Sequence, residues 1–200
     1  TSFKTDVPAH DVDVILARPT DRSITVSVHA SDAAEATVEY WPTGNSTRRK
    51  SVPVTTGANT VTNIEITGLT RGTEYIYRLG LAKHNQPIHW GDDQRFRTRP
   101  APGTPFTFVM QADSHLDQGV EPAVYEQTLA NMLAARPDFV IDLGDTFMTD
   151  QRGKEFKSAL AQYDAQRYYF GQLARSAPLF MVLGNHDGEK GSSGTAPDDI

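Results

Sequence analysis

Short stretches of alternating hydrophobic and polar residues fill the first hundred positions of the chain. About seven such stretches, rich in Val, Ile, Thr and Tyr, are separated by turn residues at intervals of roughly a dozen. The alternation is clear at Ile24, Val26 and Val28, which share one face of a strand. This pattern predicts an all-β sandwich over residues 1–99, with one face of each strand in the core and the other in water.

The pattern changes after a proline-rich segment. Residues 100–105 read Pro-Ala-Pro-Gly-Thr-Pro, and we interpret them as a linker between two domains. Beyond the linker, apolar runs of strand length alternate with segments of helical periodicity. In chain order these segments are 106–110, 122–135, 139–143, 153–175 and 179–183. The order β-α-β-α-β predicts a parallel sheet with right-handed crossovers, and therefore an α/β domain over residues 106–200.

Each predicted strand of this second domain ends in side chains that can bind a metal ion. The three strand ends read Asp113-Ser114-His115, Asp142-Leu143-Gly144-Asp145 and Gly184-Asn185-His186-Asp187. Because the carboxyl ends of parallel strands meet at one edge of a sheet, we expect these side chains to lie close together. Oxygen and imidazole ligands without sulfur suit a pair of metal ions, and a carboxylate can bridge the two.

Each of these residues also has a purely structural interpretation. Asp113 and Asp145 could cap a turn, and Asn185 could be a turn residue after Gly184. Three such motifs, in order and at matching strand ends, favour ligands over turn residues. Asp142 is the exception, because it sits inside an otherwise buried strand, and there we favour a structural hydrogen-bonding role.

Charge is distributed unevenly between the two halves of the chain. The formal net charge is −6, and residues 1–100 hold 12 basic and 11 acidic side chains against 7 basic and 14 acidic in residues 101–200. An acidic half argues against nucleic acid as the main partner, because Lys and Arg supply the affinity for phosphate backbones. It also leaves room for bound cations.

Other classes of protein are excluded by what the composition lacks. With no cysteine, the chain has no disulfide, no thiolate metal site and no cysteine nucleophile. No apolar run approaches the eighteen or so residues of a membrane span, so we expect a soluble protein. The compartment and the oligomeric state stay open, with a secreted or periplasmic location as a working hypothesis, because secreted proteins can also lack disulfides.

The strand-end motifs resemble the signature of the calcineurin-like metallophosphoesterase superfamily. That signature is Asp-x-His, then Gly-Asp, then Gly-Asn-His-Asp or Gly-Asn-His-Glu, and the resemblance covers residues 106–187. The run 69–79 resembles the fibronectin type III domain at the corner before its sixth strand, where a tyrosine closes the sandwich. A fibronectin-like sandwich in front of such a domain is the layout of the purple acid phosphatases, which the whole chain resembles.

The resemblance implies a phosphoric ester hydrolase with a dinuclear centre of Fe, Mn or Zn. One metal ion would be held by Asp113, His115 and Asp145. The second would be held by Asp145, as a bridging ligand, and by Asn185. A metal-bound hydroxide would then attack the phosphorus of a small-molecule phosphate ester.

The same resemblance assigns catalytic roles to the third strand end. We expect His186 to protonate or hydrogen-bond the leaving ester oxygen and Asp187 to orient its imidazole. A phosphomonoesterase is the first expectation. A phosphodiesterase or nuclease of the same superfamily would share every residue named, and a non-catalytic binding module would explain the sandwich but not the ligand-bearing strand ends.

The chain departs from the family pattern in two ways. Purple members have glycine where this chain has His115 and a tyrosine ligand at the position of Met148, so we expect no purple colour and a ligand role for His115. The superfamily also has three more histidines after the third strand, whereas His186 is the last histidine here. We therefore expect the chain to be the amino-terminal part of a longer enzyme, and these 200 residues alone to be weakly active or inactive.

Overall fold

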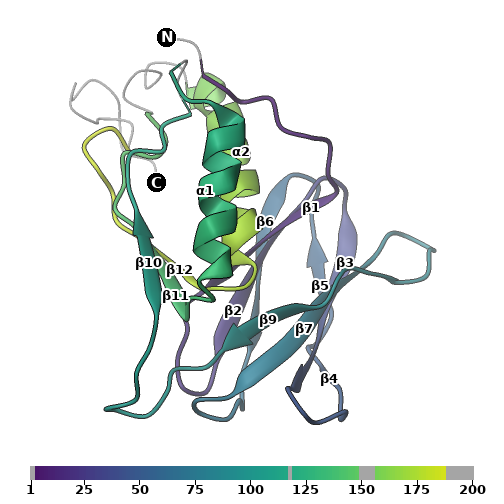
Figure 1. The fold of residues 1–200 in the computed structure, drawn as a ribbon. Helices are drawn as coiled ribbons and strands as arrows, with labels where there is room; N and C mark the ends of the chain where they lie inside the picture. The colour runs from purple at the N-terminus through teal and green to yellow at the C-terminus, as the bar shows by residue number, and fades with distance from the viewer. Residues whose placement is uncertain (1–2, 117–118, 149–155, 188–200) are drawn as a thin grey trace.

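The structure is a computed structural model that describes residues 3–116, 119–148 and 156–187. Within helix α2, the side chains are described from Leu160 onward. A mostly β amino-terminal half precedes an α/β half, as the sequence predicts (Figure 1). Among the described residues, neither helix is long and apolar enough to cross a membrane.

Two antiparallel sheets form the amino-terminal half. The first has the order β1-β2-β6, and the second has the order β4-β3-β7-β8, with β5 paired to β3 and β9 paired to β7. The strands are β1 (Val12–Ala17), β2 (Ile24–Ala30), β3 (Ala34–Pro42), β4 (Arg49–Lys50), β5 (Val54–Thr56), β6 (Thr60–Ile66), β7 (Glu74–Ala82), β8 (His89–Trp90) and β9 (Gln94–Arg97). Within the described stretch 3–116 this sandwich has nine strands, whereas the sequence pattern predicted about seven. Pro53, which has no N–H to donate, lies between β4 and β5.

The inward faces of the two sheets make the first hydrophobic core. It is built from alternating positions, as the period of two along a strand requires. Its largest fully buried members include Leu16, Ile24, Val26, Ile66, Leu69, Tyr77 and Phe96. At one end, the hydroxyl of Tyr75 accepts a hydrogen bond of 2.9 Å from the backbone N–H of Thr70. A tyrosine therefore closes the corner of the sandwich where the fibronectin-like motif places one.

The second half is a three-stranded parallel sheet in the order β10-β11-β12. Its elements are β10 (Phe108–Gln111), α1 (Pro122–Ala134), β11 (Phe139–Asp142), α2 (Phe156–Ala174) and β12 (Leu179–Met181). A second core, with Leu129 of α1, Val140 of β11 and Leu173 of α2, joins both helices to the sheet. The predicted β-α-β-α-β order is confirmed.

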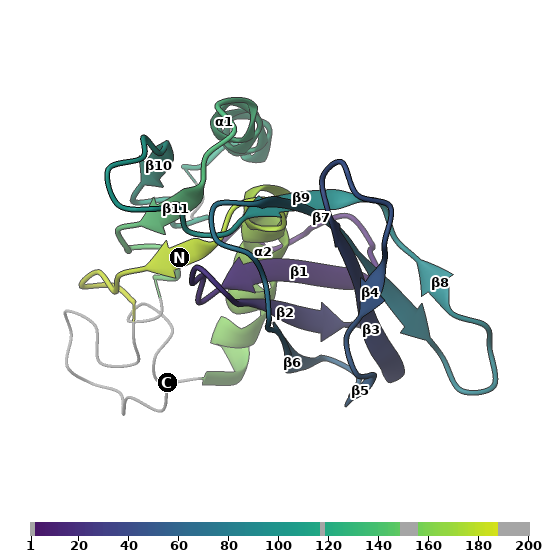
Figure 2. The same cartoon turned by 90° about the horizontal axis from the view of Figure 1, so that it is seen from below.

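Helix α2 lies between the parallel sheet and the sandwich (Figure 2). Phe170 of α2 packs with Ile15 of β1, and Arg167 donates hydrogen bonds of 3.0 Å to both the carbonyl and the hydroxyl of Ser27 on β2. Burial lowers the pKa of the Arg167 guanidinium, although nearby carboxylates oppose this. The hydroxyl of Tyr77 donates to the carbonyl of Arg175, and burial raises the pKa of this phenol, which keeps it a donor.

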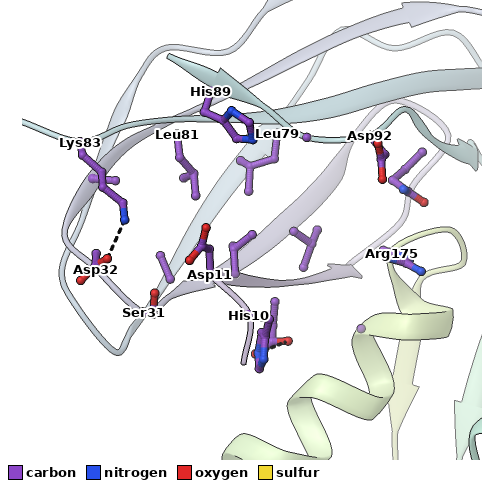
Figure 3. Close-up of a pocket in the computed structure, with 18 of the residues that line it drawn as sticks. His10, Asp11, Ser31, Asp32, Leu79, Leu81, Lys83, His89, Asp92 and Arg175 are labelled. Atoms are coloured by element: carbon purple, nitrogen blue, oxygen red, sulfur yellow. Dashed lines mark hydrogen bonds and ion pairs between the residues drawn. The ribbon is translucent and has the colours of Figure 1, made fainter. Parts of the chain in front are cut away.

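A cavity of about 630 Å³ opens beside this interface (Figure 3). Leu79 and Leu81 of β7 line its apolar floor, and the Lys83–Asp32 ion pair, 2.7 Å long, stands at its edge. Arg175, just beyond the end of α2, lines the opposite side. None of the described residues that line this cavity is a predicted metal ligand, so the cavity is separate from the strand-end site.

Candidate metal centre

The structure brings together three of the four predicted metal ligands. Asp113 and His115 follow β10, and Asp145 follows β11. One ligand atom from each of these side chains lies within 4.8 Å of the other two. Nε2 of His115 is 3.5 Å from Oδ1 of Asp113. Parallel pairing of β10 with β11 produces this convergence, because it puts both strand ends at the same edge.

The third strand end contacts this cluster through its backbone. The N–H of His186 donates a hydrogen bond of 2.9 Å to Oδ1 of Asp145. The imidazole rings of His115 and His186 meet edge to face, with their centroids 6.0 Å apart. Asn185, the fourth predicted ligand, is exposed and directly precedes this hydrogen-bonded residue. All three strand-end motifs therefore share one site.

Two glycines allow the second and third strand ends to approach this closely. Gly144 has a φ of 93°, and a Cβ at this position would collide with the backbone of Gly184. A Cβ at Gly184 would in turn collide with the side chain of Asp145. Any larger residue at either position would push the loops apart, so both glycines are required by the geometry of the site.

Asp142 has the structural role that the sequence favoured. It is fully buried, and its Oδ1 accepts hydrogen bonds from the N–H of Gly144 at 3.0 Å and the hydroxyl of Thr146 at 2.7 Å. Its Oδ2 accepts from Nε2 of Gln111 at 2.8 Å. Both oxygens are thus used to shape the turn that presents Asp145.

Asp187 connects the loops that follow β11 and β12. Its Oδ1 accepts hydrogen bonds from the N–H groups of Thr146 and Phe147, at 2.7 and 2.8 Å, and its Oδ2 accepts from the N–H of Gly184 at 2.9 Å. The side chain is only 6% exposed. Both oxygens therefore already serve backbone groups, and the orienting role expected toward His186 stays a prediction.

We expect the substitution Asp187→Asn to loosen these two loops. The amide nitrogen of asparagine cannot accept a hydrogen bond, so at least one of the three backbone N–H groups would lose its acceptor. The hydrogen bonds that remain would no longer be made to a charged group. Hydrogen exchange of the Thr146, Phe147 and Gly184 amides should accelerate by about 10-fold or more. Amides of β2 are the internal control and should keep their rates. Unchanged exchange at all three amides would contradict the bridging role of Asp187.

Residues that the sequence analysis did not assign to the site support the same loops. Gln162 and Gln166 of α2 and Tyr125 of α1 lie beneath the site, and the two glutamines are fully buried. Nε2 of Gln111 donates to the hydroxyl of Tyr125 at 3.2 Å. Burial raises the pKa of Tyr125 to about 12, so its hydroxyl stays protonated. The only signal in the sequence was two glutamines four residues apart within a predicted amphipathic helix.

The donor set fits a divalent metal ion. Two carboxylates and one imidazole converge, and backbone φ angles of 57°, 43° and 52° at Asp113, His115 and Asp145 place all three residues in the left-handed region. Such conformations are costly for residues other than glycine and cluster at functional sites. The arrangement can hold a cation.

Comparisons with known proteins agree with this geometry. Residues 10–98 match the purple acid phosphatase N-terminal domain family, and residues 106–198 match the calcineurin-like phosphoesterase family. A comparison with curated protein sequences gave no significant match.

Two solved structures share the fold over most of the chain. The purple acid phosphatase PPD1 from yellow lupin (Lupinus luteus) superposes with a TM-score of 0.68 at 18% identity, over 88% of this chain and 35% of its own. The structure of PhoD superposes with a TM-score of 0.59 at 16% identity, over 87% of this chain and 38% of its own. The chain thus spans well under half the length of either. A segment that matches the purple acid phosphatase N-terminal domain family is thus followed by a segment that matches the calcineurin-like phosphoesterase family.

Proposed function

We propose that this chain carries active-site residues of a metal-dependent phosphomonoesterase. The observation that supports the proposal most is the convergence of Asp113, His115 and Asp145 within 4.8 Å. These residues come from two adjacent strand ends of a domain whose family is named for phosphoesterase activity. Residues 101–200 carry more acidic than basic side chains, and bound cations would compensate this negative charge.

Two metal ions, of Fe, Mn or Zn, are proposed for the site. Asp113, His115 and Asp145 would hold the first, and Asp145 with Asn185 would hold the second. Oδ1 of Asp145 already accepts the N–H of His186, which orients the carboxylate toward the cluster. When bound, the metal ions would neutralise the phosphate and activate water for attack on phosphorus.

His186 is proposed as the proton donor to the leaving group. Its backbone is fixed by Asp145, while its half-buried ring lies beside the ring of His115. A protonated ring nitrogen of His186 would donate its proton to the leaving ester oxygen, so that an alcohol and inorganic phosphate are released. Asp187 supports this role by holding the loop that carries His186.

Hydrolysis of an activated aryl phosphate, such as p-nitrophenyl phosphate, tests the proposal. We expect turnover in the presence of Mn²⁺, Zn²⁺ or iron, its loss on chelation, and its return when the metal is restored. Turnover by these 200 residues should be slow, because only Asp145 and Asn185 are assigned to the second ion. Activity that survives exhaustive chelation would contradict the proposal, and faster hydrolysis of bis(p-nitrophenyl) phosphate would favour a phosphodiesterase.

A further inference from the structure

Helix α2 presents two fully buried glutamines to the loops of the metal site. Gln162 and Gln166 are four residues apart and lie on one face of the helix. Burying an amide is costly unless its hydrogen bonds are made. The partners of these two amides therefore indicate what the glutamines hold.

Both amides donate to the loops that carry the predicted ligands. Nε2 of Gln166 donates to the hydroxyl of Ser114 at 2.7 Å and to the carbonyl of Thr146 at 2.9 Å. Nε2 of Gln162 donates to the carbonyl of His115 at 2.9 Å. Ser114 lies between two predicted ligands, and Thr146 directly follows a third. One helix thus ties the loop after β10 to the loop after β11.

These hydrogen bonds reach loops whose backbone is strained. The predicted ligands Asp113, His115 and Asp145 all have positive φ angles, which disfavour any residue except glycine. Such conformations persist only where surrounding contacts over-determine them. The hydrogen bonds from Gln162 and Gln166 supply part of that constraint.

The neighbouring face of α2 is anchored in the sandwich. Arg167, the residue after Gln166, donates two side-chain hydrogen bonds to Ser27 of β2. Phe170 packs against Ile15 of β1. The position of the helix, and of the amides it carries, is therefore set partly by the amino-terminal domain.

We propose that Gln162 and Gln166 are positioning residues for the metal site, and that the sandwich acts on the site through α2. This inference rests on the proposed function, because it assumes that the cluster binds metal. It assigns the amino-terminal domain a direct mechanical role: without the support of the sandwich, the helix could shift and the two ligand loops would separate.

Calorimetric titration of the full chain with Mn²⁺ tests the role of the amides without measuring activity. Gln166→Met keeps the side-chain volume but removes the donor, and it should weaken Mn²⁺ binding by about 10- to 100-fold, as is typical for residues that orient ligands. Gln172→Met is the matched control, because Gln172 lies on the same helix and its amide faces Glu126. This control should bind Mn²⁺ like the wild type.

Ser114→Ala provides a second, milder variant that removes the acceptor instead of the donor. It should also weaken Mn²⁺ binding, even if Gln166→Met fails to fold. Both variants should unfold at a temperature close to that of the wild type in the absence of metal. If either variant is less stable, its loss of Mn²⁺ affinity should be greater than the loss that its lower stability explains. Wild-type Mn²⁺ affinity in folded Gln166→Met and Ser114→Ala would overturn the positioning role. A wild-type chain that binds no Mn²⁺ would instead overturn the proposed function, and this inference with it.

Arg167→Met tests the contribution of the sandwich. The methionine keeps the aliphatic packing but loses the hydrogen bonds to Ser27, at a site that contacts no predicted ligand. We expect Mn²⁺ affinity to fall by about 3- to 10-fold, the range of moderate coupling between distant positions. Unchanged affinity would show that the sandwich does not act on the metal site.

Discussion

Replacing Asp145 with asparagine should abolish phosphate ester hydrolysis and remove most of the bound metal. Asp145 is the one residue proposed to contact both metal ions, and its ligand atom lies within 4.8 Å of those of Asp113 and His115. Loss of its charge should lower kcat/KM by roughly 10³-fold or more, which corresponds to the several kcal/mol that metal ions supply. Metal content by mass spectrometry and turnover of p-nitrophenyl phosphate are the two measurements.

The design of this variant separates loss of metal from loss of structure. Asparagine keeps an oxygen at Oδ1, so the hydrogen bond from the N–H of His186 can persist. Asp32→Asn is the matched control, because Asp32 is an exposed aspartate of the sandwich that pairs with Lys83. The control should retain metal and activity. An Asp145→Asn variant with full metal content and full turnover would show that this carboxylate is not a bridging ligand.

Replacing His186 with alanine should lower turnover by roughly 10²- to 10⁴-fold while metal content stays near that of the wild type, the range expected for loss of a general acid. The N–H that holds Asp145 belongs to the backbone, and alanine retains it. The loss should be larger for an alkyl phosphate than for an aryl phosphate, because a poor leaving group depends more on protonation.

Metal content distinguishes the possible roles of His186. His84→Ala, in an exposed turn of the sandwich, is the control and should behave like the wild type. If His186→Ala loses metal and activity together, His186 is a ligand and the role of proton donor is wrong. If turnover is unchanged for both classes of substrate, another group protonates the leaving oxygen.

Much of the fold follows from signals that are local in the sequence. Period-two alternation at Ile24, Val26 and Val28 places their side chains in the sandwich core, and all three are buried. Helical periodicity and short apolar runs identify the β-α-β-α-β order. These signals are informative because a strand or a helix repeats its geometry every few residues. Burial of one face therefore requires hydrophobic residues at regular intervals in the sequence.

The convergence of the predicted ligands could also be expected from the sequence. Three short motifs follow three parallel strands, and parallel pairing brings their ends to one edge. The glycines in these motifs have a local cause as well, since Gly144 has a positive φ and no room for a Cβ. Residue type and position relative to a strand were sufficient to predict that Asp113, His115 and Asp145 lie close together.

Tertiary structure alone decided which residues hold those ligands in place. Asp187 was expected to orient the imidazole of His186, and only the structure reveals that its oxygens also accept three backbone N–H groups from two loops. Gln162 and Gln166 had no distinguishing motif, because a glutamine in a helix is ordinary until its neighbours across the fold are known. Their partners at Ser114, His115 and Thr146 lie between 20 and 52 residues away in the sequence. Hydrogen bonds over such separations depend on how α2 packs between the sheet and the sandwich, and no periodic pattern within one element encodes that packing.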